Sequence, residues 1–166
     1  MRPQVVILDA EPVVRFTIAA ILDRAGYNVV QTDDPICVLN LLKHGMPALV
    51  ICDAALPDIT CSEAIRLFRH YRPEIALLML SCEPSYEIMT CCRREDCDFF
   101  LKPFKAAQFK MKVQSVLGRR SSQTMPPTAP RRVAALRLIR QFQQQPPHTM
   151  RHQAEDERGA QFLEVL

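Results

Sequence analysis

The chain has 166 residues, 48% of them hydrophobic and 23% charged, with a formal net charge of +3. This composition is typical of globular proteins and excludes collagen-like, coiled-coil and wholly disordered chains. No apolar run reaches the roughly 18 uncharged residues of a membrane-spanning helix, and the first run ends at Asp9 and Glu11 without a small-residue cleavage site. We therefore expect a cytoplasmic protein that does not bind membranes.

Short apolar runs recur along the first 118 residues and are typical of buried strands. They cover residues 4–8, 27–31, 48–52, 75–80 and 98–101. All-apolar runs suit strands that helices cover on both faces. Between the runs, apolar residues recur at helical spacing, as Val14, Ile18 and Leu22 do in the first such stretch and Phe109, Val113 in the last.

Proline, aspartate and glycine mark the ends of the expected helices. Pro12 and Pro35 fall where a first helical turn begins, and Asp33 and Asp34 precede Pro35 as candidate helix caps. Gly26 and Gly118 are expected to end the first and last helices. Five strands alternating with five helices predict an α/β domain over residues 1–118, with a doubly wound, five-stranded parallel sheet.

The charge of the chain is concentrated after this domain. Residues 1–118 hold 13 Lys and Arg against 14 Asp and Glu, whereas residues 119–166 hold 8 Arg and 4 acids. We expect a proline-rich linker over 119–130, a basic amphipathic helix over 131–145 and a flexible tail over 146–166. No helix-turn-helix pair accompanies the basic helix, so the sequence disfavours DNA as a partner and favours docking of this helix on a protein surface.

The seven cysteines indicate buried apolar side chains rather than disulfides or a zinc site. Their number is odd, which disfavours a disulfide framework. Cys91, Cys92 and Cys97 cluster in the sequence, but they form no CxxC pair of the kind that binds zinc. Free cysteine is among the residues most often buried in protein cores.

Polar side chains follow four of the expected strands. Asp9, Asp53, Ser81 and Lys102 come at the ends of the first, third, fourth and fifth runs. The carboxyl ends of parallel strands meet at one edge of the sheet, which is where open α/β sheets bind ligands. Two carboxylates suit magnesium, and the serine and lysine suit a phosphoryl group. The sequence therefore predicts a magnesium and phosphoryl site at this edge.

Four segments carry a resemblance to a known family. They are VVILDAEPVVR, VICDAALPDITCSEAIRLFR, LLMLSCE and DFFLKPF. In order and spacing they resemble the receiver domain of two-component response regulators over residues 4–117. The resemblance implies a flavodoxin-like (βα)5 fold, with Asp53 as the phosphoacceptor and with Ser81 and Lys102 binding the phosphoryl group.

The same resemblance implies further roles at the site. Phe99 falls at the aromatic switch position, and Asp9 and Asp53 fall at metal-ligand positions for magnesium. The bond between Lys102 and Pro103 is expected to be cis, which is tolerated mainly before proline. The family would take its phosphoryl group from a histidine kinase or a phosphotransfer protein and signal to a downstream protein partner. Such a phosphoprotein is not an enzyme beyond autocatalytic phosphoryl acceptance and hydrolysis.

One departure from the family pattern leaves alternatives open. The family has two adjacent acids after the first strand, and here the second is Ala10. A missing carboxylate should weaken the magnesium site. One alternative is therefore a pseudo-receiver, a binding module that is phosphorylated weakly or not at all. A second is an enzyme of the haloacid dehalogenase type, with Asp9 in its nucleophile loop, although this leaves the Asp53 segment unexplained.

Overall fold

The computed structural model describes residues 2–57 and 59–121, which fold around one parallel sheet. The strands are β1 Gln4–Leu8, β2 Asn28–Thr32, β3 Leu49–Asp53, β4 Ala76–Ser81 and β5 Asp98–Leu101, and their order in the sheet is β2-β1-β3-β4-β5. The helices are α1 Pro12–Arg24, α2 Pro35–His44, α3 Cys61–Tyr71, α4 Tyr86–Arg94 and α5 Ala106–Ser121. Each predicted strand lies within one residue of an observed strand, and the predicted fold class is confirmed.

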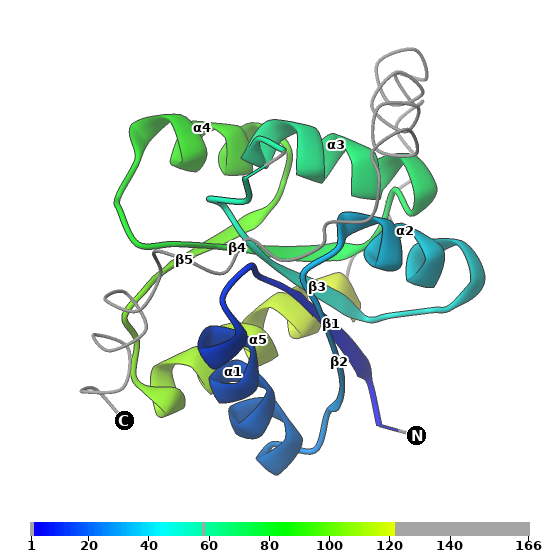
Figure 1. Ribbon diagram of the computed structural model, residues 1–166, viewed down its shortest axis with the longest axis vertical. Helices are drawn as coiled ribbons and strands as arrows, with labels where there is room; N and C mark the ends of the chain where they lie inside the picture. The colour runs from blue at the N-terminus through cyan, green and yellow to red at the C-terminus, as the bar shows by residue number, and fades with distance from the viewer. Residues whose placement is uncertain (1, 58, 122–166) are drawn as a thin grey trace.

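The helices cover both faces of the sheet, which makes three layers (Figure 1). Helices α1 and α5 pack on one face and α2, α3 and α4 on the other. Alternate residues of a strand point to opposite faces, so Val6 contributes to the core under α2–α4 and Ile7 to the core under α1 and α5. The central strands β1, β3 and β4 are almost wholly buried, which explains their continuous apolar runs.

Local capping interactions set several helix ends. The Asp34 side chain accepts a hydrogen bond of 2.8 Å from the backbone N–H of Ile36, which confirms it as the cap of α2. Gly26 follows α1 with a φ of +90°, a left-handed conformation that favours glycine. Helix α3 begins with a capping box in which the Thr60 and Glu63 side chains each accept from the other's backbone N–H.

The prediction that Gly118 ends the last helix is wrong. Helix α5 continues through Gly118 to Ser121 and takes up the start of the expected linker. Gly26 is the glycine with positive φ among the described residues, so nothing in the backbone of Gly118 breaks the helix. Asp98 of β5 also pairs with Arg119 beyond the glycine, which holds this last turn against the sheet.

The expected remainder of the linker, the basic helix 131–145 and the tail 146–166 lie outside the described residues. Their boundaries stay predictions from the sequence. Across residues 2–57 and 59–121, none of the helices is both long and apolar enough to span a bilayer.

Candidate functional site

The four polar residues predicted at the strand ends lie at one edge of the sheet. Asp9 follows β1, Asp53 and Ser81 are the last residues of β3 and β4, and Lys102 follows β5. Strands β1, β3, β4 and β5 are consecutive neighbours in the sheet, so their carboxyl ends converge. The four residues are nearly inaccessible, with exposed fractions of 1% for Asp9, 8% for Asp53, 6% for Ser81 and 5% for Lys102. Charged side chains reach such burial when they are paired.

Lys102 provides that pairing by bridging both carboxylates. Its Nζ lies 2.8 Å from Asp9 Oδ2 and 3.2 Å from Asp53 Oδ1. The backbone N–H of Lys102 also donates to the carbonyl of Ser81 at 2.8 Å, which fixes the lysine against the end of β4. One cation therefore holds two carboxylates from different strands in a common site.

Burial and charge act in opposite directions on these groups. Burial raises the pKa of the Asp53 carboxyl, the Lys102 ammonium lowers it in part and the Asp9 carboxylate raises it, so the pKa lies above its ordinary value. For Lys102, burial lowers the pKa, but the Asp9 and Asp53 carboxylates outweigh burial and the net direction is upward. The lysine therefore stays protonated beside both carboxylates at neutral pH.

Arg15 supports the loop that carries Asp9, a role that no motif in the sequence predicts. Its guanidinium donates to the carbonyl of Asp9 and, at 3.1 Å, to that of Ala10, and lies 3.6 Å from an oxygen of Asp33. The backbone N–H of Glu11 donates to Asp9 Oδ1 at 2.9 Å. Arg15 is an ordinary first-turn residue of α1 in the sequence, and only its fold position brings it to these carbonyls.

Ser81 forms its hydrogen bonds within the β4–α4 loop, and Phe99 lies within β5, where it pairs with Met79 of β4. The Ser81 hydroxyl donates to the carbonyl of Glu83 at 2.9 Å and accepts from the Glu83 N–H at 3.2 Å. Phe99 is half-buried in β5 and packs with the core beneath α2–α4. The peptide bond between Lys102 and Pro103 is cis, as predicted.

All seven cysteines are free thiols. Cys52, Cys61, Cys91 and Cys92 are buried, as the sequence predicted, whereas Cys82 is exposed. Burial raises the pKa of Cys52, so its thiol stays protonated in the core. Within the part of the chain that the structure describes, no group of three His, Cys, Asp or Glu side chains is placed to hold a metal ion.

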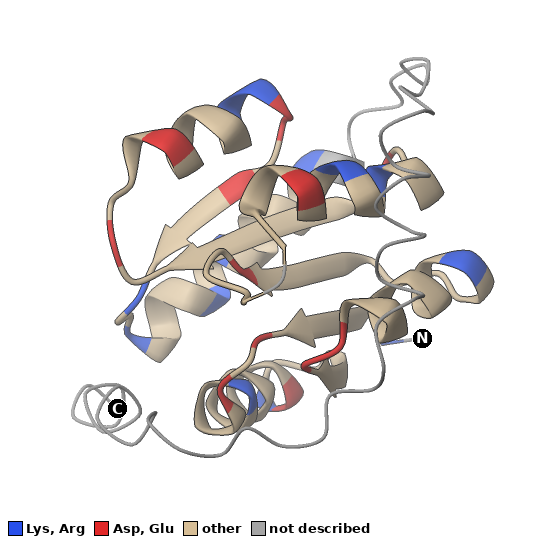
Figure 2. Cartoon of the chain, turned by 45° about the horizontal axis from the view of Figure 1, so that its top comes forward, with Lys and Arg blue, Asp and Glu red and all other residues tan. Residues whose placement is uncertain are grey.

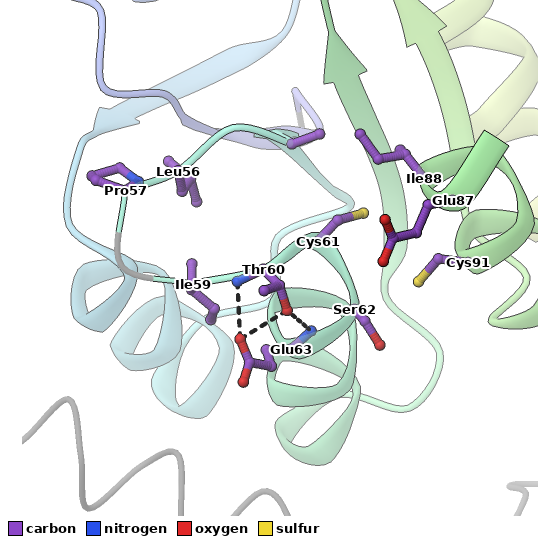
Figure 3. Close-up of a pocket in the computed structure, with 11 residues that line it drawn as sticks. Leu56, Pro57, Ile59, Thr60, Cys61, Ser62, Glu63, Glu87, Ile88 and Cys91 are labelled. Carbon is purple, nitrogen blue, oxygen red and sulfur yellow. Dashed lines mark hydrogen bonds between the residues drawn. The ribbon is translucent and has the colours of Figure 1, made fainter. Parts of the chain in front are cut away.

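A cavity of about 580 Å³ lies next to the carboxylate site, between the β3–α3 loop and α4 (Figure 3). The residues that line it include apolar Leu56, Ile59 and Ile88 and the acids Glu63 and Glu87. Figure 3 shows Glu87 and Ile88 approaching it from α4 and the Thr60–Glu63 capping box from the start of α3. The sequence did not predict this cavity, because its lining combines one loop with residues of two helices, α3 and α4.

A lysine that bridges two buried carboxylates at the carboxyl edge of a (βα)5 sheet defines a class of protein, the receiver-type signalling module. The chain belongs to the response regulator receiver domain family, whose sequence profile matches residues 5–114. The two-component signalling role that the sequence predicted is thereby established for this domain. No finding favours the pseudo-receiver over a working receiver, and the match includes the Asp53 segment that a haloacid dehalogenase would leave unexplained.

Individual relatives agree with this assignment. BvgA of Bordetella pertussis, whose name describes a transcription regulator of virulence factors, is 28% identical over 85 residues, which cover 51% of this chain and 41% of BvgA. TcrX of Mycobacterium tuberculosis, whose name describes a transcriptional regulatory protein, is 24% identical over 117 residues, 69% of this chain and 50% of TcrX. The matched region thus spans half or less of these curated relatives.

Solved structures show the same fold. The CheY-like receiver domain protein of Methanospirillum hungatei JF-1 aligns with a TM-score of 0.68 and 20% identity, over 74% of this chain and 98% of that one. Receiver domains are generally signalling modules rather than enzymes. As a class they bind magnesium for phosphorylation and interact with histidine kinases and downstream effectors.

Proposed function

We propose that Asp53 accepts a phosphoryl group from a histidine kinase or a phosphotransfer protein. The observation that carries the proposal is the position of Lys102 Nζ, 2.8 Å from Asp9 and 3.2 Å from Asp53. A buried ammonium at this point lowers the pKa of Asp53 against the burial that raises it, and so favours the carboxylate form that a nucleophile needs. The same ammonium is placed to pair with phosphoryl oxygens as they arrive.

The reaction is an in-line displacement at phosphorus. An Asp53 carboxylate oxygen attacks the phosphorus of a phosphohistidine, the phosphorus–nitrogen bond breaks, and the leaving imidazole nitrogen takes up a proton. Hydrolysis reverses the modification when water attacks the acyl phosphate and inorganic phosphate leaves. The chain's own residues contribute positioning and charge rather than covalent chemistry beyond Asp53, which is how phosphoryl transfer is generally catalysed.

Asp9 and Asp53 are the residues that would hold magnesium. Magnesium in phosphoryl-transfer sites binds through one or two carboxylates, with water and phosphate completing its shell, and two carboxylates sharing Lys102 fit that set. Ala10 offers no side-chain oxygen, so we propose that magnesium binds more weakly than at a site with three acids. Bound magnesium would offset the negative charge on the phosphoryl group during transfer.

The output is proposed to be a change of packing around β5 and α4. A phosphoryl group on Asp53 would offer new acceptors to the Ser81 hydroxyl, which now donates to the Glu83 carbonyl at the start of the β4–α4 loop. Turning Ser81 toward Asp53 frees space on the side where Phe99 is half-buried, and Phe99 then moves inward. This rearranges the surface that a downstream protein partner would contact.

Intact-mass measurement with a small acyl phosphate donor tests the proposal. The wild-type protein with magnesium should gain one phosphoryl group, and Asp53→Asn should gain none. Asp9→Asn should raise the magnesium concentration needed without moving the modified residue. No gain at any magnesium concentration would refute the proposal and favour the pseudo-receiver, and modification that survives Asp53→Asn would place the acceptor elsewhere.

A further inference from the structure

Four thiols gather between α3 and α4, two helices that lie side by side on one face of the sheet (Figure 1) and appear so again in a second view, each with an acid in its first turn (Figure 2). Cys61 begins α3, Cys91 and Cys92 lie in α4, and Cys97 precedes β5. The thiol of Cys61 interacts with those of Cys91 and Cys92. The thiol of Cys92 also interacts with that of Cys97, whose backbone N–H donates to the Cys92 carbonyl at 2.8 Å. Side chains far apart in the sequence thus form one thiol cluster.

Cys61 and Cys92 are the pair in this cluster that a covalent bond would join most directly. The contact with Cys92 is the largest cause of the raised pKa of Cys61, and Cys61 is in turn the largest single influence on the pKa of Cys92. The other two thiols have further partners, because Cys91 interacts with the Ser62 hydroxyl and Cys97 donates to two backbone carbonyls. A disulfide needs two sulfur atoms that small side-chain rotations can bring together, and this pair meets that need across two helices.

The cavity next to the carboxylate site gives a small oxidant a route to the pair. Cys61 and Cys91 line it, and Figure 3 shows their side chains on its α3 and α4 sides. Its volume of about 580 Å³ is many times the roughly 30 Å³ that a water molecule occupies, and hydrogen peroxide is only slightly larger than water. Cys61 is 8% exposed, whereas Cys92 is 2% exposed and does not line the cavity. An oxidant in the cavity therefore meets Cys61 first.

We propose that Cys61 and Cys92 form a reversible disulfide between α3 and α4 when hydrogen peroxide enters the cavity. The Cys61 sulfur attacks one peroxide oxygen, the O–O bond breaks, and the leaving hydroxide takes the Cys61 proton as water, which leaves a sulfenic acid. The Cys92 sulfur then attacks the Cys61 sulfur, the S–O bond breaks, and the leaving hydroxide takes the Cys92 proton as a second water. One peroxide is reduced, and two thiols are oxidised to one disulfide.

The two steps should differ in speed. The contact with Cys92, and then burial, raise the pKa of Cys61. For Cys92, the contact with Cys61 lowers the pKa, but the contact with Cys97 and burial outweigh it and raise the pKa to about 12. Little thiolate is therefore present for the attack on peroxide, whereas the second step joins groups already in contact and is fast. The pair should respond to sustained oxidation rather than consume peroxide as an enzyme does.

The disulfide would fix the start of α3 to α4. Helix α3 follows the loop that leads from Asp53, and α4 is the helix whose packing is proposed to change on phosphorylation. A covalent link between the two should hold α4 in place, so the oxidised protein would accept a phosphoryl group without passing the change on. This consequence rests on the proposed function, whereas formation of the disulfide does not.

Disulfide mapping by mass spectrometry tests the inference on the full chain without phosphorylation. All samples carry Cys82→Ser, which removes the exposed thiol. After treatment with hydrogen peroxide and alkylation in denaturant, the protein should carry two alkyl groups fewer than its reduced form, and one cross-linked peptide pair should contain Cys61 and Cys92. Cys61→Ala and Cys92→Ala should each abolish this pair. Cys91→Ala, at the neighbouring thiol that also lines the cavity, is the matched control and should keep it.

Thermal unfolding gives a second measurement of the same bond. A cross-link that closes a loop of about thirty residues should raise Tm by about 10 °C. Oxidised Cys91→Ala should show this rise, oxidised Cys92→Ala should not, and dithiothreitol should reverse it. Asp53→Asn should form the disulfide as readily as the protein with Asp53, so a failure of phosphoryl transfer would leave this result unaffected.

Two outcomes would overturn the inference. Full alkylation after prolonged peroxide treatment, with no rise in Tm, would show that the thiols do not form a bond. A cross-link that joins Cys61 to Cys91, or to a second molecule, would show that α3 and α4 are not linked through Cys92.

Discussion

Replacing Lys102 by methionine tests the electrostatic core of the site. Methionine keeps much of the length and apolar character of the lysine stem but leaves Asp9 and Asp53 buried without a cation. Removing one partner of a buried ion pair costs about 3–5 kcal/mol, and the short distances of 2.8 and 3.2 Å place Lys102 in that range. We expect the free energy of unfolding at pH 7 to fall by about this amount.

The pH dependence of the loss identifies its cause. The pKa of Asp53 is already raised by burial, and without Lys102 it should rise further. A carboxyl whose pKa is higher in the folded than in the unfolded state adds stability at low pH and loses it as pH rises through the folded pKa. The deficit of Lys102→Met should therefore be smaller at about pH 5 than at pH 7, because the Asp53 carboxyl takes up a proton more readily without the lysine.

Urea unfolding followed by circular dichroism at both pH values measures this difference. Lys105→Met is the matched control, because Lys105 is exposed and close in sequence, and it should change stability by no more than about 0.5 kcal/mol. A loss at Lys102 below about 1 kcal/mol, or a loss equal at both pH values, would refute the view that this cation supports the two buried carboxylates.

Three further predictions concern the metal site, the α3 cap and the thiols. Ala10→Asp should tighten magnesium binding by about tenfold in calorimetric titration, and unchanged affinity would show that position 10 does not face the metal. Thr60→Ala should lower the free energy of unfolding by about 0.5–2 kcal/mol through loss of the capping box, whereas Thr90→Ala, exposed on α4, should change it little. Iodoacetamide should alkylate the exposed Cys82 before the other six cysteines, as peptide mass spectrometry would show, and a first reaction at the buried Cys52 would contradict the structure.

The fold was predictable because its determinants are local and repeated. The strands β1, β3 and β4 are buried on both faces, so their sequences are continuously apolar and unambiguous. Proline and aspartate at the start of α2 predicted its boundary correctly. The prediction that Gly118 ends α5 was wrong, because a glycine typically ends a helix where its backbone is left-handed. The pairing of Arg119 with Asp98 instead favours a further helical turn.

The sequence predicted which residues form the site but not how their side chains contact one another. Parallel strands bring their carboxyl ends to one edge, so Asp9, Asp53 and Lys102 could be grouped from their places in the sequence. That Lys102 bridges both carboxylates depends on three-dimensional distances that spacing does not encode. The position of Arg15 under the β1–α1 loop and the cavity beside α4 arise from contacts between elements, and no short motif reports them.

The position of Asp98 has a mechanical consequence. Oδ1 of this first residue of β5 lies 2.8 Å from Nζ of Lys112 and also pairs with Arg119. One carboxylate therefore joins the edge strand to two turns of α5. Asp98 immediately precedes Phe99, the side chain proposed to move inward. A displacement of β5 would then act on α5 through these two ion pairs, the second of which lies near the end of the helix. The last turn of α5 would thereby respond to the position of Phe99.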